Sequence, residues 1–215
     1  MVARPPTRSA SALRREMVVI GRRLYERGLI VAAEGNISVR LPNGRTLVTP
    51  AGFCKGRMTT RDLVVVDADG RTVSGPWPPS SEVRMHLAAL AARTDVNACV
   101  HAHPPYATAF AVAGIALTEP VLPEVIVTLR SIPLAEYATP GTGAVGVSIE
   151  RHIAGADAIL LKNHGVLTLG VDLETAFRRM EIVERCAQVI CLARGLGHVD
   201  HLSPSQVGEL FRPNR

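Results

Sequence analysis

The chain has 215 residues, 47% of them hydrophobic and 4% aromatic, with a formal net charge of +5 and a pI near 9.4. This length suits one large domain with a buried core. Nearly all basic residues are dispersed arginines, without the basic stripe or aromatic platform of a nucleic-acid binder, so we expect no nucleic-acid partner. The charge instead favours small anionic substrates.

The sequence also argues against a membrane or secreted protein. Residues 1–15 lack the apolar stretch of a secretory signal, and no apolar segment is long enough to span a bilayer. Its four cysteines form no Cys-x-x-Cys pair, and three of them lie in apolar segments, as reduced thiols commonly do. The four are Cys54, Cys99, Cys186 and Cys191. We expect a cytoplasmic protein with no membrane partner.

The first part of the chain predicts one helix and several short strands. Residues 1–8, with Pro5-Pro6, are expected to be disordered, and residues 9–215 to form a single domain. Apolar residues then recur at helical spacing up to a stop at Gly28. Antiparallel strands follow near 36–40, 46–49, 63–67 and 71–73, two pairs of them joined by Asn43-Gly44 and Asp69-Gly70. The apolar positions of the helix are Leu13, Met17, Ile20 and Leu24.

The segment Pro79-Ser80-Ser81-Glu82 precedes a helical pattern at Val83, Leu87 and Leu90. A serine cap at 80 or 81, with Glu82 in the first turn, accounts for these residues. The functional alternative is that the hydroxyls and free amides bind a phosphate or carboxylate while Glu82 faces a metal.

Two histidines two residues apart follow an apolar run that ends at Pro104-Pro105. Because side chains at i and i+2 of a strand share a face, His101 and His103 can meet one cation at the strand end. A second apolar run, 158–162, ends at Asn163-His164-Gly165. Three histidines at two strand ends form a common ligand set for zinc with one position left open.

The remaining segments predict further helices and strands. A helix is expected near 106–112, one or two short strands in the β-branched stretch 122–134, and a helix near 144–154. Glu124 is either a site residue or a surface acid. A hairpin of 158–162 with 166–169 precedes a long helix opened by Asp172, and Ser203-Pro204 begins a short terminal helix. The apolar stripe of the long helix comprises Leu173, Ala176, Phe177, Met180, Val183, Ala187, Ile190 and Cys191.

Helices and strands alternate, but the strand connections look short and antiparallel. The sequence thus predicts an α/β fold, a sheet flanked by helices, and not a doubly wound nucleotide fold. No Gly-rich dinucleotide or P-loop motif is present.

The ordered motifs of the chain resemble the class II aldolase/adducin family, typified by L-fuculose-phosphate aldolase, from about Leu13 to Leu192. The motifs are Gly35-Asn36-Ile37-Ser38, Thr49-Pro50-Ala51-Gly52, Pro79-Ser80-Ser81-Glu82, His101-Ala102-His103 and Asn163-His164-Gly165. The resemblance implies a three-layer α/β/α fold with a mostly antiparallel central sheet. It also implies a homotetramer with active sites at its interfaces.

Carried over by position, the resemblance assigns roles to ten residues. Zn²⁺, or alternatively Mn²⁺, Co²⁺ or Fe²⁺, is held by His101, His103 and His164, together with Glu82, which also serves as the catalytic acid/base. Gly35, Asn36, Ala51, Gly52, Ser80 and Ser81 occupy the substrate- and phosphate-binding positions. Ala51 departs from the family, whose sugar-phosphate members have a hydroxyl residue there. The family's interface tyrosine has no secure counterpart, although Tyr137 lies near that region.

The resemblance implies a lyase. The first reading is reversible aldol cleavage of a ketose, in particular a ketose 1-phosphate, to dihydroxyacetone phosphate and an aldehyde through a metal-stabilised enediolate. The alternative is a metal-dependent decarboxylase of a keto or aromatic acid. A substrate carboxylate, in place of a phosphate, would then lie beside Ala51. A non-catalytic adducin-like domain is the third reading, which the complete histidine set and Glu82 argue against.

Overall fold

The computed structural model describes residues 8–212, so the predicted disorder of residues 1–8 lies almost wholly outside the described residues. The helices within this range are α1 (Ala10–Glu26), α2 (Val83–Ala92), α3 (Pro105–Val112), α4 (Pro123–Leu129), α5 (Ala144–Ile153), α6 (Leu173–Leu196) and α7 (Pro204–Glu209). The strands are β1 (Asn36–Arg40), β2 (Thr46–Val48), β3 (Val64–Val66), β4 (Thr72–Ser74), β5 (Ala98–Ala102), β6 (Leu134–Ala135), β7 (Ala158–Leu161) and β8 (Gly165–Gly170).

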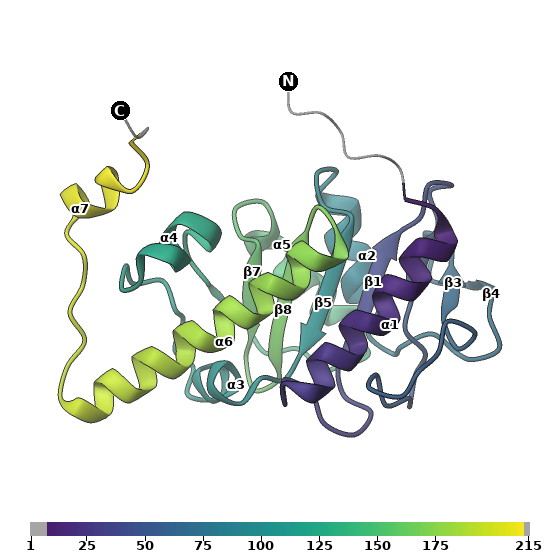
Figure 1. The fold of residues 1–215 in the computed structure, drawn as a ribbon, viewed down its shortest axis with the longest axis horizontal. Coiled ribbons are helices and arrows are strands. Elements are labelled where there is room, and N and C mark those ends of the chain that lie inside the picture. The colour runs from purple at the N-terminus through teal and green to yellow at the C-terminus, as the bar shows by residue number, and fades with distance from the viewer. Residues whose placement is uncertain (1–7, 213–215) are drawn as a thin grey trace.

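The eight strands form one sheet in the order β4-β3-β2-β1-β5-β8-β7-β6. Every neighbouring pair is antiparallel except β6 and β7, which are parallel. In Figure 1, α1 and α6 cross the near face of the sheet, and α2 and α5 lie behind it. The predicted α/β fold, with a mostly antiparallel sheet between two helical layers, is confirmed.

Each face of the sheet has its own apolar core. Met17 of α1 and Phe177 of α6 belong to one cluster, and Met85 of α2 and Ile149 of α5 belong to the other, all four side chains being fully buried. The four apolar positions predicted for α1 are all buried. Burial of both sheet faces explains why β5, β7 and β8 have apolar residues on both sides.

Three predictions about local structure are wrong. The strands expected in 122–134 are mostly helix α4, where only Leu134–Ala135 is a strand. Helix α4 forms for two reasons. Pro123 occupies its first turn, where an amide N–H has no hydrogen-bond partner within the helix, so its absence breaks no bond. Val125, Ile126 and Leu129 also bury one face of the helix. Cys191 of the predicted α6 stripe is exposed, and Cys186 is buried instead.

The third correction concerns the start of α2. Neither serine caps it by a side-chain bond to the helix, since the N-cap residue is Glu82 and has no capping hydrogen bond of its own. Ser80 Oγ instead accepts a hydrogen bond from the Glu82 amide at 3.4 Å. Glu82 is thus the N-cap residue of α2, and its carboxylate, which makes no capping hydrogen bond, can contact residues outside the helix.

Two further observations bear on the sequence predictions. All four cysteines are free thiols. Within residues 8–212, none of the helices combines the length and the apolar character needed to cross a bilayer.

Candidate active site

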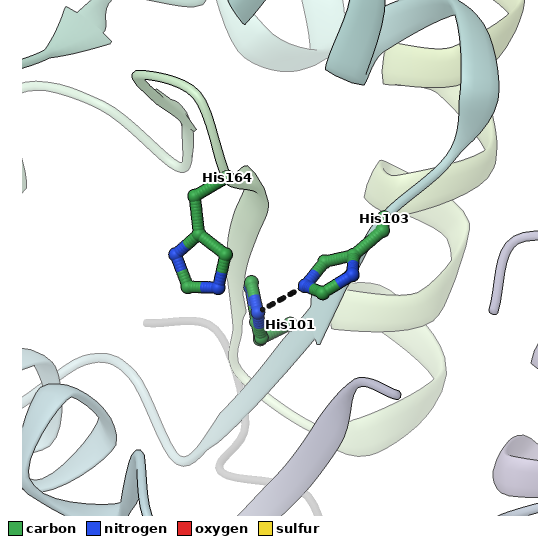
Figure 2. Close-up of side chains that lie close together, drawn as sticks. All are labelled: His101, His103 and His164. Carbon is green, nitrogen blue, oxygen red and sulfur yellow. Dashed lines mark hydrogen bonds between the residues drawn. The ribbon is translucent and has the colours of Figure 1, made fainter. Parts of the chain in front are cut away.

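Three imidazoles converge at the ends of neighbouring strands (Figure 2). His101 lies on β5, His103 follows that strand directly, and His164 lies in the turn between β7 and β8. One ring nitrogen from each histidine lies within 4.8 Å of the other two. The Nε2 atoms of His101 and His103 are 3.0 Å apart. The predicted meeting of the three histidines is therefore observed.

Backbone contacts hold this arrangement. His101 is completely buried, and its Nδ1 lies 2.9 Å from the carbonyl oxygen of Val166, to which it can only donate. This contact leaves Nε2 of His101 facing the centre of the cluster. Gly165 permits the turn to approach, since a Cβ there would lie 2.5 Å from the Ala102 carbonyl oxygen.

The Glu82 carboxylate faces the same centre. Its Oε2 lies 3.1 Å from His101 Nε2, and its Oε1 lies 3.3 Å from His164 Nε2. Asn36 donates its Nδ2 hydrogen to Glu82 Oε2 at 2.9 Å. Asn36 is in turn placed by the β1–β5 pairing, which sets it opposite His101. Sheet register and helix start thus bring together four residues from four separate segments.

Burial and neighbouring charge determine the protonation of these groups. Burial works to raise the pKa of Glu82, but His101, His164 and the Asn36 amide outweigh it and hold this pKa well below its usual range. Burial, together with the nearby His101, lowers the pKa of His164 to about 4 and also lowers that of His103. At neutral pH the site therefore presents the ionised Glu82 carboxylate beside the neutral imidazoles of His103 and His164, the protonation state that cation binding requires.

The residues fit a divalent cation. Among residues 8–212, Glu82 Oε1 and Asn36 Oδ1 are buried oxygens without a hydrogen-bond partner. Three imidazole nitrogens and one carboxylate oxygen are the ligand types that zinc and similar ions prefer. A cation at their centre would satisfy the unpaired Glu82 oxygen.

A cavity of about 370 Å³ opens beside the histidines. All six residues assigned to substrate and phosphate binding line it, and so do Glu82, His103 and His164. The six are Gly35, Asn36, Ala51, Gly52, Ser80 and Ser81. His101 lies beneath the cavity and is fully buried.

Backbone hydrogen bonds join two of the segments that line the cavity. The Ala51 amide donates to the Pro78 carbonyl at 3.0 Å, and the Ser80 amide donates to the Thr49 carbonyl at 3.1 Å. These bonds place Ala51 and Gly52 beside the two serines. Gly35 has φ +67°, and a Cβ there would lie 2.8 Å from the His101 carbonyl oxygen, so its first role is to let the loop pass close to β5.

Sequence reasoning missed Lys55, which lines the cavity although only 2% of it is exposed. Its Nζ donates a hydrogen bond to the Ala33 carbonyl at 2.6 Å. Burial lowers the pKa of Lys55 to about 8, so the ammonium remains mostly protonated at neutral pH. The signal available in the sequence was a lysine three residues after Gly52 in a chain that otherwise uses arginine.

Two other residues considered from the sequence lie away from the cavity lining. Tyr137 is 57% exposed, and Glu124 is exposed in the first turn of α4. For Glu124 the structure favours the surface-acid interpretation. Glu34 was not selected from the sequence, yet it lines the cavity, and its carboxylate lies 3.6 Å from His103 Nδ1.

Sequence comparison yields relatives of two activities. The chain is 33% identical over 203 residues to a 3-oxo-tetronate 4-phosphate decarboxylase of Escherichia coli strain K12, covering 93% of this chain and 95% of that protein. It is 34% identical over 174 residues to an L-fuculose phosphate aldolase of Methanococcus maripaludis, covering 81% of this chain and 93% of that one.

Solved structures also match nearly the whole chain. An L-fuculose 1-phosphate aldolase matches with a TM-score of 0.87 and 33% identity over 95% of this chain and 97% of the other. YgbL from Escherichia coli matches with a TM-score of 0.86 and 32% identity over 92% and 97%. The family model described as Class II Aldolase and Adducin N-terminal domain covers residues 15–191. This chain therefore belongs to the class II aldolase and adducin family.

Proposed function

We propose that the chain is a divalent-cation-dependent lyase that breaks a carbon–carbon bond in a small phosphorylated substrate. Its primary reaction would be reversible aldol cleavage of a ketose 1-phosphate to dihydroxyacetone phosphate and an aldehyde. The observation that carries the proposal is the Glu82 carboxylate, 3.1 Å from His101 and 3.3 Å from His164, at the end of a cavity that Ser80 and Ser81 also line. Zinc is the proposed ion, with manganese, cobalt and iron as alternatives.

Each group in the site would have a distinct role. His101, His103 and His164 would hold the cation, with Glu82 as a further ligand before substrate enters. A bound divalent cation supplies a Lewis acid that stabilises negative charge on the substrate's oxygens. The hydroxyls of Ser80 and Ser81, with the amide of Gly52, would donate hydrogen bonds to the phosphate.

Glu82 would move the carbon-bound proton. In the cleavage direction the Glu82 carboxylate would accept the proton of the substrate hydroxyl as the carbon–carbon bond breaks, which yields the aldehyde. Glu82 would then give this proton to the carbon left on the ketone fragment, and in the reverse direction both transfers run backwards. Asn36, through its 2.9 Å hydrogen bond, would orient the carboxylate for both steps.

Decarboxylation of a keto acid is the second candidate. Ala51, which lacks the hydroxyl expected in a sugar-phosphate aldolase, favours it, and a 3-oxo-tetronate 4-phosphate decarboxylase of Escherichia coli is among the relatives. Release of carbon dioxide leaves the same type of carbanion, to which Glu82 would deliver a proton.

Product analysis tests the proposal and separates its two forms. The protein is incubated with ketose 1-phosphates and with a 3-oxo acid 4-phosphate, before and after chelation and after return of the metal. Chelator-sensitive formation of dihydroxyacetone phosphate supports the aldolase, whereas chelator-sensitive carbon dioxide release supports the decarboxylase. Turnover that survives complete metal removal would contradict both forms.

A further inference from the structure

Lys55 is unusual in this chain because 22 of the 24 basic residues are arginine, Lys55 and Lys162 being the two lysines. The Lys162 ammonium lies near Glu136, at 3.7 Å, and its side chain is 41% exposed. Lys55 is 2% exposed and lines the candidate active-site cavity. Burying an ammonium costs free energy unless the charge is paired with a polar or charged group, so Lys55 is a candidate for binding a ligand.

The Lys55 charge has no close counterion. Within residues 8–212 no carboxylate oxygen lies within 4.0 Å of its Nζ, which donates one hydrogen bond, to the Ala33 carbonyl. An ammonium offers three donors. The carboxylates of the cavity are engaged elsewhere, Glu82 with the imidazoles and Glu34 with His103 and the Val31 amide. Two donors and a positive charge thus remain for whatever enters the cavity.

The backbone around Lys55 is held tightly against α1. A Cβ at Gly21 would lie 2.8 Å from the Lys55 carbonyl oxygen, and one at Gly56 would lie 2.6 Å from the Tyr25 ring. Helix α1 therefore packs directly on this segment with no room for a side chain between them. This packing fixes the origin of the lysine side chain at the cavity wall.

We propose that the Lys55 ammonium binds the phosphate group of the substrate and replaces the hydrogen bond that Ala51 cannot give. Both residues line one cavity with Gly52, Ser80 and Ser81. A charge-assisted bond from an ammonium to a phosphate oxygen is stronger than one from a neutral hydroxyl. The inference rests on the proposed function in that the substrate carries a phosphate.

Calorimetric titration of the metal-loaded, full-length protein with methyl phosphate tests this role. Lys55→Met removes charge and donors, whereas Lys55→Gln removes the charge but retains an N–H donor that can reach toward Ala33. Both variants are expected to raise Kd at least tenfold, and the matched control Lys162→Met to leave it within twofold. Acetate is expected to bind wild-type protein at least tenfold more weakly than methyl phosphate.

Several results would overturn the inference. Unchanged affinity for methyl phosphate in both Lys55 variants would overturn it. Wild-type affinity in Lys55→Gln alone would also overturn it, because the role of the lysine would then be only to hold the Ala33 loop through its N–H donor. Equal affinity for acetate would refute the phosphate class. Melting temperature and bound metal are measured for each variant, since a purely structural role would lower both together with the affinity.

A second measurement needs no variant. Reductive methylation of wild-type protein, mapped by mass spectrometry, should be slowed at least fivefold at Lys55 by saturating methyl phosphate and left unchanged at Lys162. Equal labelling with and without methyl phosphate would overturn the inference. The product analysis described above reports on the lyase function separately, so failure of Lys55 to bind phosphate and failure of the lyase proposal are distinguished.

Discussion

At the scale of single residues, the Glu82 carboxylate is the group on which the chemistry depends. We expect Glu82→Gln to lower kcat by about 100-fold or more, because the amide cannot carry the proton, whereas it can still accept the hydrogen bond from Asn36. Steady-state kinetics with bound metal measured in parallel would check this. Glu136→Gln, at a side chain 68% exposed, is the matched control. Full turnover by metal-loaded Glu82→Gln would refute the proton-transfer role.

The convergence of the three histidines could be predicted from the sequence because its geometric cause is local. Two histidines at i and i+2 share a face by strand geometry alone, and Asn163-His164-Gly165 marks a turn in any fold. Lys55 could not be found in this way. Lys55 is buried beside α1, and within residues 8–212 no carboxylate oxygen lies within 4.0 Å of its Nζ; both features depend on segments distant in sequence.

At the scale of elements, a buried hydrogen bond between His86 of α2 and Ser38 of β1 joins the two elements, and His86 is a titratable group. His86 Nδ1 lies 2.7 Å from Ser38 Oγ, and burial lowers the pKa of His86 to about 3. Between pH 6.5 and that value the unfolded chain binds a proton that the folded chain does not. Stability should therefore fall as pH falls through this window, by about 1.4 kcal/mol per pH unit for this one group.

Denaturant unfolding of the chelated protein at several pH values between 6.5 and 4.5 would measure this contribution. In His86→Asn the slope of unfolding free energy against pH should be shallower by about that amount, since the other histidines are common to both proteins. An identical slope in His86→Asn would show that His86 is not the group responsible.

The close approach of the β7–β8 turn to β5 gives a second prediction at this scale. In Gly165→Ala the new methyl group would meet the Ala102 carbonyl at 2.5 Å and the His103 ring at 2.6 Å, which displaces a histidine. We expect about 1 to 3 kcal/mol of destabilisation and weaker metal binding. Gly155→Ala, where a Cβ meets nothing within 4 Å, is the control. Wild-type metal affinity in Gly165→Ala would contradict the described geometry.

Local pattern failed where tertiary packing decided the outcome. The β-branched stretch 122–134 favours strands by propensity, yet helix α4 packs Val125 and Leu129 onto the core on the α6 side of the sheet and also buries Ile126. Val127, in contrast, remains 53% exposed. Helical burial of three apolar side chains outweighed the intrinsic preference of the segment.

At the scale of the whole molecule, the predicted homotetramer with active sites at its interfaces stays a proposal. Helix α6 extends beyond the sheet (Figure 1), and Leu192 and Leu196 near its end are 57% and 90% exposed. Light scattering after size exclusion should give about four times the 23.0 kDa chain mass. A monomer that is fully active would contradict a site completed by a neighbouring subunit.

The central claim is that His101, His103 and His164 form a single cation site with Glu82. Isothermal titration of the chelated protein with Zn²⁺ measures it most directly. We predict one tight site per chain in the wild type and at least a 100-fold weaker one in His103→Ala. The His103 side chain is 23% exposed, whereas His101 is completely buried, so this substitution disturbs the core less than one at His101. Undiminished tight binding in His103→Ala, or no binding by the wild type, would contradict the claim.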